Sequence, residues 1–159
     1  MKPLFWSLAL FSLAGLSSCG DAPLYSQFYR ISGSDWHRDS IVQFDVPIEN
    51  IKGKYVIEVH IRHGSEYAYR NIYMGRRIVG ARGIEYQDTS EVQLASPEGE
   101  WLGTGLGGIK TQVVPFKGQL LQFKKKGVYR FQFQQVMRDN PLVGIRQVGL
   151  VITSVDASR

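Results

Sequence analysis

The sequence predicts an all-β protein, a single antiparallel β-sandwich that is jelly-roll-like and has about eight strands. Apolar and polar residues alternate with a two-residue period along much of the chain, whereas the spacing of an amphipathic helix is hard to find. Val, Ile, Tyr and Phe, which favour strands, are abundant. Gly, Pro, Asn and Ser separate the alternating stretches, as turn residues do.

The N-terminal segment 1–18 has the organisation of a lipoprotein signal peptide. Lys2 gives it a positive charge, and the apolar stretch that follows is too short for a bilayer-spanning helix. This stretch closes on Ser18, directly before Cys19, the one cysteine of the chain. We expect cleavage at this point and lipidation of Cys19. The alternative is an ordinary secretory peptide, which would leave a free thiol.

After cleavage, residues 19–23 would form a lipidated N-terminus and a short leash, and residues 24–159 one sandwich domain. Two or more acyl chains hold a protein firmly at a membrane, so attachment should be permanent. Gly20 stands where a retention signal for the inner membrane would have Asp. The sequence therefore favours the outer membrane, with the domain facing the periplasm.

The expected strands follow from the alternation. Residues 55–62 are the clearest, because Tyr55, Ile57, Val59 and Ile61 alternate with more polar residues. The same pattern marks 41–47 and 128–136, and 148–153 closes the domain. Weaker strands are expected at 70–74, 118–123 and 84–94, the last at a sheet edge because many of its residues are polar.

Basic residues are too few and too scattered to indicate a nucleic-acid partner. The formal charge is +5, and removal of the segment that carries Lys2 lowers it to +4. Clusters occur at Arg76–Arg77 and at Lys124–Lys126. The three lysines precede Gly127 and a strand, which is typical of a solvated turn. Contact with anionic lipid headgroups is the alternative.

Candidate metal, cofactor and catalytic groups are weak. His60 and His63 point to opposite faces of an extended strand, and we expect both, with His37, at the surface and no metal. Glu98 and Glu100 resemble a glycosidase pair in spacing, but Pro97 and Gly99 indicate a loop. The run 103–108 is rich in glycine but lacks the spacing of a phosphate-binding loop, so no cofactor is expected.

The tryptophans leave two interpretations open. Trp101 and Leu102 are expected to fill the core beneath the glycine-rich run. Alternatively, Trp36 and Trp101, with Tyr67 or Tyr69, form an exposed platform on which sugars stack, and the protein binds carbohydrate or cell-wall polymer.

Four stretches carry a resemblance to one family. They are Asp35–Trp36 with the strand 41–47, YVIEVHIRHGSEYAYRNIYM at 55–74, WLGTGLGGIKTQ at 101–112, and GVYRFQFQQVMRDNPLVGIRQVGLVI at 127–152. Together with the residues before Cys19 they resemble the gliding-motility lipoprotein (GldH) family. The resemblance implies a non-enzymatic envelope lipoprotein required for gliding motility, for the associated protein secretion machinery, or for both, with other envelope proteins as partners.

The segment that includes Met137, Arg138, Asn140 and Pro141 is the expected partner-binding loop. It is polar and irregular and lies between two strong strands. Asn-Pro also starts turns, so a simple strand connection is the equally weighted alternative. Trp36 and Trp101 complete the candidate contact residues.

Overall fold

The computed structural model describes residues 22–118 and 120–155. The predicted signal segment 1–18, Cys19 and most of the leash therefore lie outside the described residues, as do the last four residues of the predicted domain. In the described part of the chain, no helix is long and apolar enough to cross a membrane.

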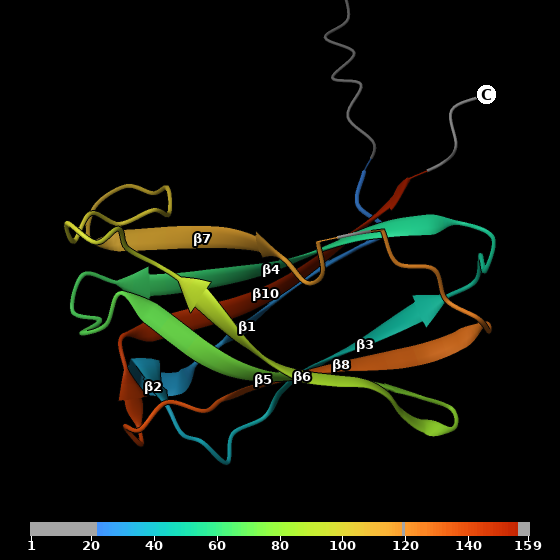
Figure 1. Ribbon diagram of the computed structural model, residues 1–159, viewed down its shortest axis with the longest axis horizontal. Coiled ribbons are helices and arrows are strands. Elements are labelled where there is room, and N and C mark those ends of the chain that lie inside the picture. The colour runs from blue at the N-terminus through green and yellow to red at the C-terminus, as the bar shows by residue number, and fades with distance from the viewer. Residues whose placement is uncertain (1–21, 119, 156–159) are drawn as a thin grey trace, which may run out of the picture.

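Two four-stranded antiparallel sheets pack face to face (Figure 1). One sheet has the order β1-β10-β4-β7 and the other β3-β8-β5-β6, with a small third pair, β2-β9. The strands are β1 (Tyr25–Arg30), β2 (Asp35–Trp36), β3 (Val42–Ile48), β4 (Lys54–Gly64), β5 (Asn71–Gly80), β6 (Gly83–Gln93), β7 (Ile109–Pro115), β8 (Gly127–Gln135), β9 (Leu142–Val143) and β10 (Ile145–Val155), with a 3-10 turn η1 at Ser32–Ser34.

This arrangement confirms the predicted all-β sandwich. If β2 and β9 are set aside, the long strands of the described residues run alternately between the sheets, apart from the β5–β6 hairpin. Numbered along the chain, they give the orders 1-8-3-6 and 2-7-4-5, which is the strand order of a jelly roll.

The core lies between the sheets and is built from the inward residues of each alternating strand. In β3, Val42, Phe44 and Val46 are buried and the residues between them are exposed. Phe131 and Phe133 of β8 face the central β4–β10 pair, and both have no exposed surface. Burying a side chain of this size contributes about 1.5–3 kcal/mol, so the alternation itself selects the sandwich.

The strand prediction was wrong at residues 118–123 and missed four strands. Residues 118–123 form no strand, and within their described part only Leu121 pairs, through an isolated bridge to Tyr55. The strands that were not predicted are β1 and β7, the two edges of the first sheet, and the two-residue strands β2 and β9. Edge strands bury little of either face, so their sequences carry no clean alternation. The edge position predicted for 84–94 is confirmed, because β6 pairs only with β5.

The sandwich has two different ends. β1 begins and β10 ends at the same end, which we call the terminal end (Figure 1). It also carries the connections 49–53 and 80–83 and the described parts, 116–118 and 120–126, of the connection between β7 and β8. The opposite end, which we call the distal end, carries the loops 64–70, 94–108 and 136–141 together with β2 and β9.

Candidate functional site: the distal loops

Trp36 forms the base of the distal end. It has no exposed surface, and its Nε1 donates a hydrogen bond of 2.8 Å to the backbone oxygen of Ser40. The short strand β2 places it opposite Leu142 of β9, which is also buried. The predicted exposure of Trp36 as a contact residue or sugar platform is therefore wrong, because the indole is the packing surface under the loop.

Gln135 fixes the start of the loop 136–141. This buried side chain donates through Nε2 to the backbone oxygens of Trp36 and Asp139, at 3.3 and 3.1 Å. Its Oε1 accepts the backbone N–H of Met137 at 2.9 Å. A buried amide satisfied on both sides fixes the loop conformation, because breaking any of these bonds leaves a polar group unpaired.

Arg38 holds the loop from the other side. Its guanidinium donates to the backbone oxygens of Met137 and Arg138, at 2.7 and 3.2 Å. Its backbone N–H donates to Oδ1 of Asn140 at 2.8 Å. The sequence analysis missed Arg38 and Gln135. No spacing signal points to them, since the Arg38 contacts and the Gln135 bond to Trp36 join residues about 100 positions apart in the chain.

The structure separates the four predicted loop residues into two roles. Met137 is buried, and its sulfur accepts the backbone N–H of Tyr73. Asn140 uses its side-chain oxygen within the fold, and Pro141, which follows a cis peptide bond, is half-buried. Arg138 is exposed, and its side chain makes no hydrogen bond or ion pair with the described residues. Of the four, Arg138 is the side chain placed to contact another molecule.

A run of rings connects Trp101 to the same loop. The ring centroid of Trp101 lies 4.4 Å from that of His63, which lies 5.8 Å from Tyr67, which in turn lies 5.9 Å from Tyr69. The Tyr69 hydroxyl donates to the Asp139 carboxylate. Hydrogen bonding to Asp139 raises the pKa of Tyr69, and burial raises the pKa of Tyr67.

Two expectations about this run of rings need correction. His63 was expected at the surface but has no exposed area, and burial lowers its pKa, which favours the neutral ring. Its opposite orientation to His60 on β4 is confirmed by the burial pattern. Leu102 was expected to fill the core but is half exposed, whereas Trp101 does pack against the core.

The glycine-rich run forms a projecting loop rather than a phosphate cradle. Gly105 and Gly107 have φ angles of +154° and +62°, and no helix follows. Leu106 at the tip is 95% exposed. Ser65 donates its backbone N–H to the oxygen of Gly108 at 2.8 Å, which ties this loop to the loop 64–70.

Glu98 and Glu100 lie in a turn, and both are exposed. A hydrogen bond from Ser96 lowers the pKa of Glu98, whereas a glycosidase acid needs a raised one. Both carboxylates thus lie exposed in the predicted loop, and the pKa of Glu98 moves in the direction opposite to that of a glycosidase acid. Within residues 22–118 and 120–155, no three His, Cys, Asp or Glu side chains gather as metal ligands would.

Fold and site together define a jelly-roll protein that presents ordered loops at the end away from its termini. Family comparison goes one step further, because the GldH lipoprotein family model matches residues 23–152. The chain therefore belongs to the GldH lipoprotein family. Membership makes it a lipid-anchored envelope protein of a motility family that is not a known enzyme family.

The relatives cover almost the whole chain. A gliding motility lipoprotein GldH homolog from Christiangramia forsetii is 31% identical over 154 residues, covering 92% of this chain and 93% of the relative. Gliding motility lipoprotein GldH from Flavobacterium johnsoniae is 32% identical over 148 residues, covering 89% and 91%.

Solved structures resemble the chain only distantly. Latent PorU from Porphyromonas gingivalis gives a TM-score of 0.37 at 11% identity, over 89% of this chain and 14% of the solved one. Infectious bursal disease virus, Gx strain, gives 0.35 at 13% identity, over 99% and 41%. The chain thus spans less than half of each solved chain.

Proposed function

We propose that the protein is a non-enzymatic binding or scaffolding component of the gliding-motility machinery, of the associated secretion machinery, or of both. A lipid on Cys19 anchors it in the outer membrane, with the domain in the periplasm, and the distal loops contact other envelope proteins. Support comes from the family, from the gliding-motility names of its relatives, and from the geometry of the distal end.

One observation carries the partner-binding part of the proposal. The loop 136–141 exposes Val136 and three polar residues and is held rigidly by Arg38 and Gln135, with Arg138 left unpaired among the described residues. A loop ordered before binding loses little conformational entropy when a partner docks. An exposed guanidinium on such a loop suits an acidic partner surface.

The position of the loop supports the same function. Only five residues lie between Cys19 and Tyr25, where β1 begins, so the chain from Cys19 to β1 spans at most about 20 Å. The terminal end is then held near the membrane, and the distal loops point away from it (Figure 1). A partner in the periplasm therefore meets the distal loops first.

Crosslinking and pull-down of the lipidated protein from its own cells, with mass spectrometry of the partners, tests this proposal. Arg138→Glu is expected to lower recovery of the envelope partner at least tenfold, because the exposed charge is reversed at the contact. Lys54→Glu is the matched control, since Lys54 is an exposed cation at the start of β4, at the terminal end. Equal recovery from both variants, or loss only with Lys54→Glu, would refute the distal contact.

The anchor is tested separately. Labelled palmitate is expected to be incorporated into the wild-type chain and not into Cys19→Ser. Sucrose-gradient fractionation should place the wild type in the outer membrane, and protease added to intact cells should leave it uncut. Cleavage in intact cells would place the domain on the outer surface instead.

A further inference from the structure

A pocket opens at the terminal end, between the β5–β6 hairpin and the connection 116–126. Its volume is about 500 Å³, within the range of small-ligand sites. Its interior is apolar and comprises Ile78, Tyr86, Phe116, Leu121, Phe123 and Tyr129. None of these residues belongs to the distal loops, so the pocket is a second site on the molecule.

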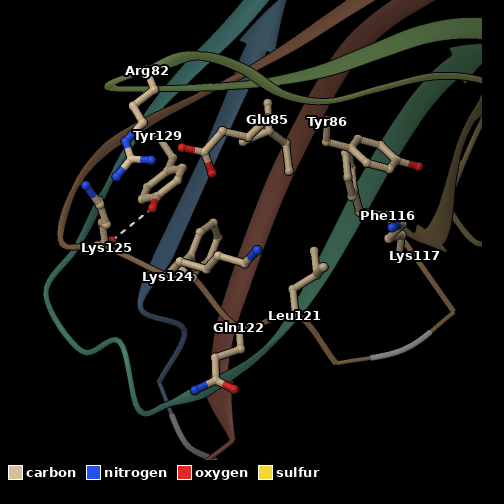
Figure 2. Close-up of a pocket in the computed structure, with 12 residues that line it drawn as sticks. Arg82, Glu85, Tyr86, Phe116, Lys117, Leu121, Gln122, Lys124, Lys125 and Tyr129 are labelled. Atoms are coloured by element: carbon tan, nitrogen blue, oxygen red, sulfur yellow. Dashed lines mark hydrogen bonds between the residues drawn. The ribbon is translucent and has the colours of Figure 1, made fainter.

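The rim of the pocket is cationic. Arg82, Lys117, Lys124 and Lys125 line it, against a single carboxylate, Glu85. Figure 2 shows the side chains of Arg82, Glu85 and Lys124 directed into the space between the hairpin and the connection. An apolar interior beneath an excess of positive charge suits a ligand with an apolar body and an anionic head.

Most of these cations have no partner within the fold. Lys117 lies over the ring of Tyr86, with its Nζ 4.4 Å from the ring centroid. By contrast, no ion pair of the described residues engages Arg82, Lys124 or Lys125. The Tyr129 hydroxyl donates a hydrogen bond to the backbone oxygen of Lys125. This bond fixes the backbone and does not involve the ammonium group of Lys125. The charges are therefore available to an anion.

The surface around the pocket is apolar where a soluble end would be polar. Ile84 at the hairpin is 58% exposed, Val128 at the start of β8 is 58% exposed, and Ile51 in the connection before β4 is 37% exposed. Gln122 donates to the backbone oxygen of Ile51, which joins this connection to the pocket wall. Exposed aliphatic residues beside lysines are typical of a surface that meets lipid headgroups.

We propose that this pocket binds an anionic phospholipid of the membrane that holds the protein. The phosphate pairs with Arg82, Lys124 and Lys125, and the glycerol backbone with the first part of the acyl chains lies on the apolar interior. The membrane as the source rests on the proposed Cys19 anchor, because the short leash keeps this end within reach of headgroups. Lys124 and Lys125 lie in a bend, and the proposal adopts the alternative interpretation of Lys124–Lys126, contact with anionic headgroups.

Lysine acetylation of the lipidated full-length protein measures this contact. The protein is reconstituted in phosphatidylcholine vesicles, with or without one third phosphatidylglycerol, and mass spectrometry gives the acetylation rate at each lysine. We expect the rates at Lys124 and Lys125 to fall at least fivefold with the anionic lipid. Lys110 is the internal control, because it is the second residue of β7 and lies at the distal end of that strand. Its acetylation rate should not change. Equal rates in both vesicles at all three lysines would overturn the proposal.

A soluble probe separates the pocket from the anchor. With the protein in neutral detergent, dihexanoyl phosphatidylglycerol below its micelle concentration should protect Lys124 and Lys125, whereas the same concentration of inorganic phosphate should not. Equal protection by phosphate would mean a simple anion site and overturn the lipid proposal. This result is independent of the anchor, because no vesicle is involved.

Variants complete the test. A lysine near an anionic lipid surface contributes about fivefold to affinity, so Lys124→Gln should raise the lipid concentration that half-protects Lys125 by about that factor. Lys110→Gln, with the same change at the other end, should leave it unaltered. A rise of similar size in both variants would show that general charge attraction, and not the pocket, produces the protection.

Discussion

The ion pair between Arg76 and Asp88 gives the most demanding test of the fold. Arg76 faces the core from β5 and is 8% exposed, while its neighbour Arg77 faces outward. Its Nε donates to Asp88 on β6 at 2.8 Å, and its Nη1 to the backbone oxygen of Phe116 at 2.6 Å. In Asp88→Asn the guanidinium stays buried, but the negative charge that balances it is gone.

The expected loss follows from the burial of the pair. Removing one partner of a fully buried ion pair costs about 3–5 kcal/mol. The Asp88 side chain is 31% exposed, so water reaches the site and reduces the penalty to about 2–3 kcal/mol. For a domain of this size, that loss corresponds to a fall in Tm of about 5–10 °C.

Urea denaturation of wild type and variant measures the loss, and Asp45→Asn is the matched control. Asp45 pairs with Arg130 across β3 and β8, but the two side chains are 48% and 47% exposed. An exposed pair contributes about 0–1 kcal/mol, so the control should change little. If the two variants lose equal stability, Arg76 is not a buried cation that needs the charge of Asp88, and the reasoning is wrong.

The pH dependence of the same difference checks its origin. Burial alone would raise the pKa of Asp88. The hydrogen bonds from Arg76 and Tyr86 and the charge of Arg76 together outweigh this effect, so the pKa lies below its usual 3.8. The stability that the carboxylate contributes is therefore present above the unfolded-state pKa and lost as the pH falls through the lower folded-state pKa. The gap between wild type and Asp88→Asn should narrow below about pH 4; a constant gap down to pH 2 would contradict an electrostatic cause.

Three further predictions concern the distal end. Because burial lowers the pKa of His63, the wild type should lose stability as the pH falls below the unfolded-state pKa of about 6.5. The variant His63→Phe, which keeps a ring against Trp101, should not show this dependence. If the urea midpoints of wild type and variant change equally between pH 7.5 and 5.5, the prediction is wrong. Trp36→Phe should lower stability by about 1–3 kcal/mol in thermal melts, through lost volume and the lost bond to Ser40, and an unchanged Tm would mean that the indole is not packed. Gly144→Ala should lower the free energy of unfolding in urea by about 2–4 kcal/mol, since its φ is +97° and a Cβ would lie 2.9 Å from Tyr67. The control Gly83→Ala, with φ of +102° and nothing within 4 Å, should lower it by about 1 kcal/mol. Equal losses would exclude the contact with Tyr67 as the cause.

The sequence predicted the strands whose burial is one-sided and missed those whose position depends on a partner. β4 reads clearly because Ile57, Val59 and Ile61 are buried and their neighbours are not. β1 has no such pattern, since Phe28 faces outward over Gly149, which has no side chain to prevent it. That contact depends on a residue more than 100 positions later, so a local pattern does not contain it.

The distal site shows the same division. The segment around Arg138 was predicted as a loop because it is polar and irregular between strong strands. Its rigidity was not predicted, because it depends on Arg38 and on one buried amide, Gln135, in a strand of alternating glutamines. Trp36 was expected at the surface, since a two-residue strand is too short to reveal which side is covered.

The two proposed contacts are compatible because they lie at opposite ends of the sandwich. β4 has 11 residues, and at about 3.3 Å per residue its ends are separated by about 35 Å. A lipid seated near Lys124 thus leaves Arg138 beyond the headgroups, where a partner in the periplasm can reach it. With only five residues between Cys19 and β1, seating the terminal end on lipid also restricts rotation of the domain. Lipid binding at one end would then raise the local concentration of the distal loops at the height of a membrane-bound partner, without any change in the loops themselves.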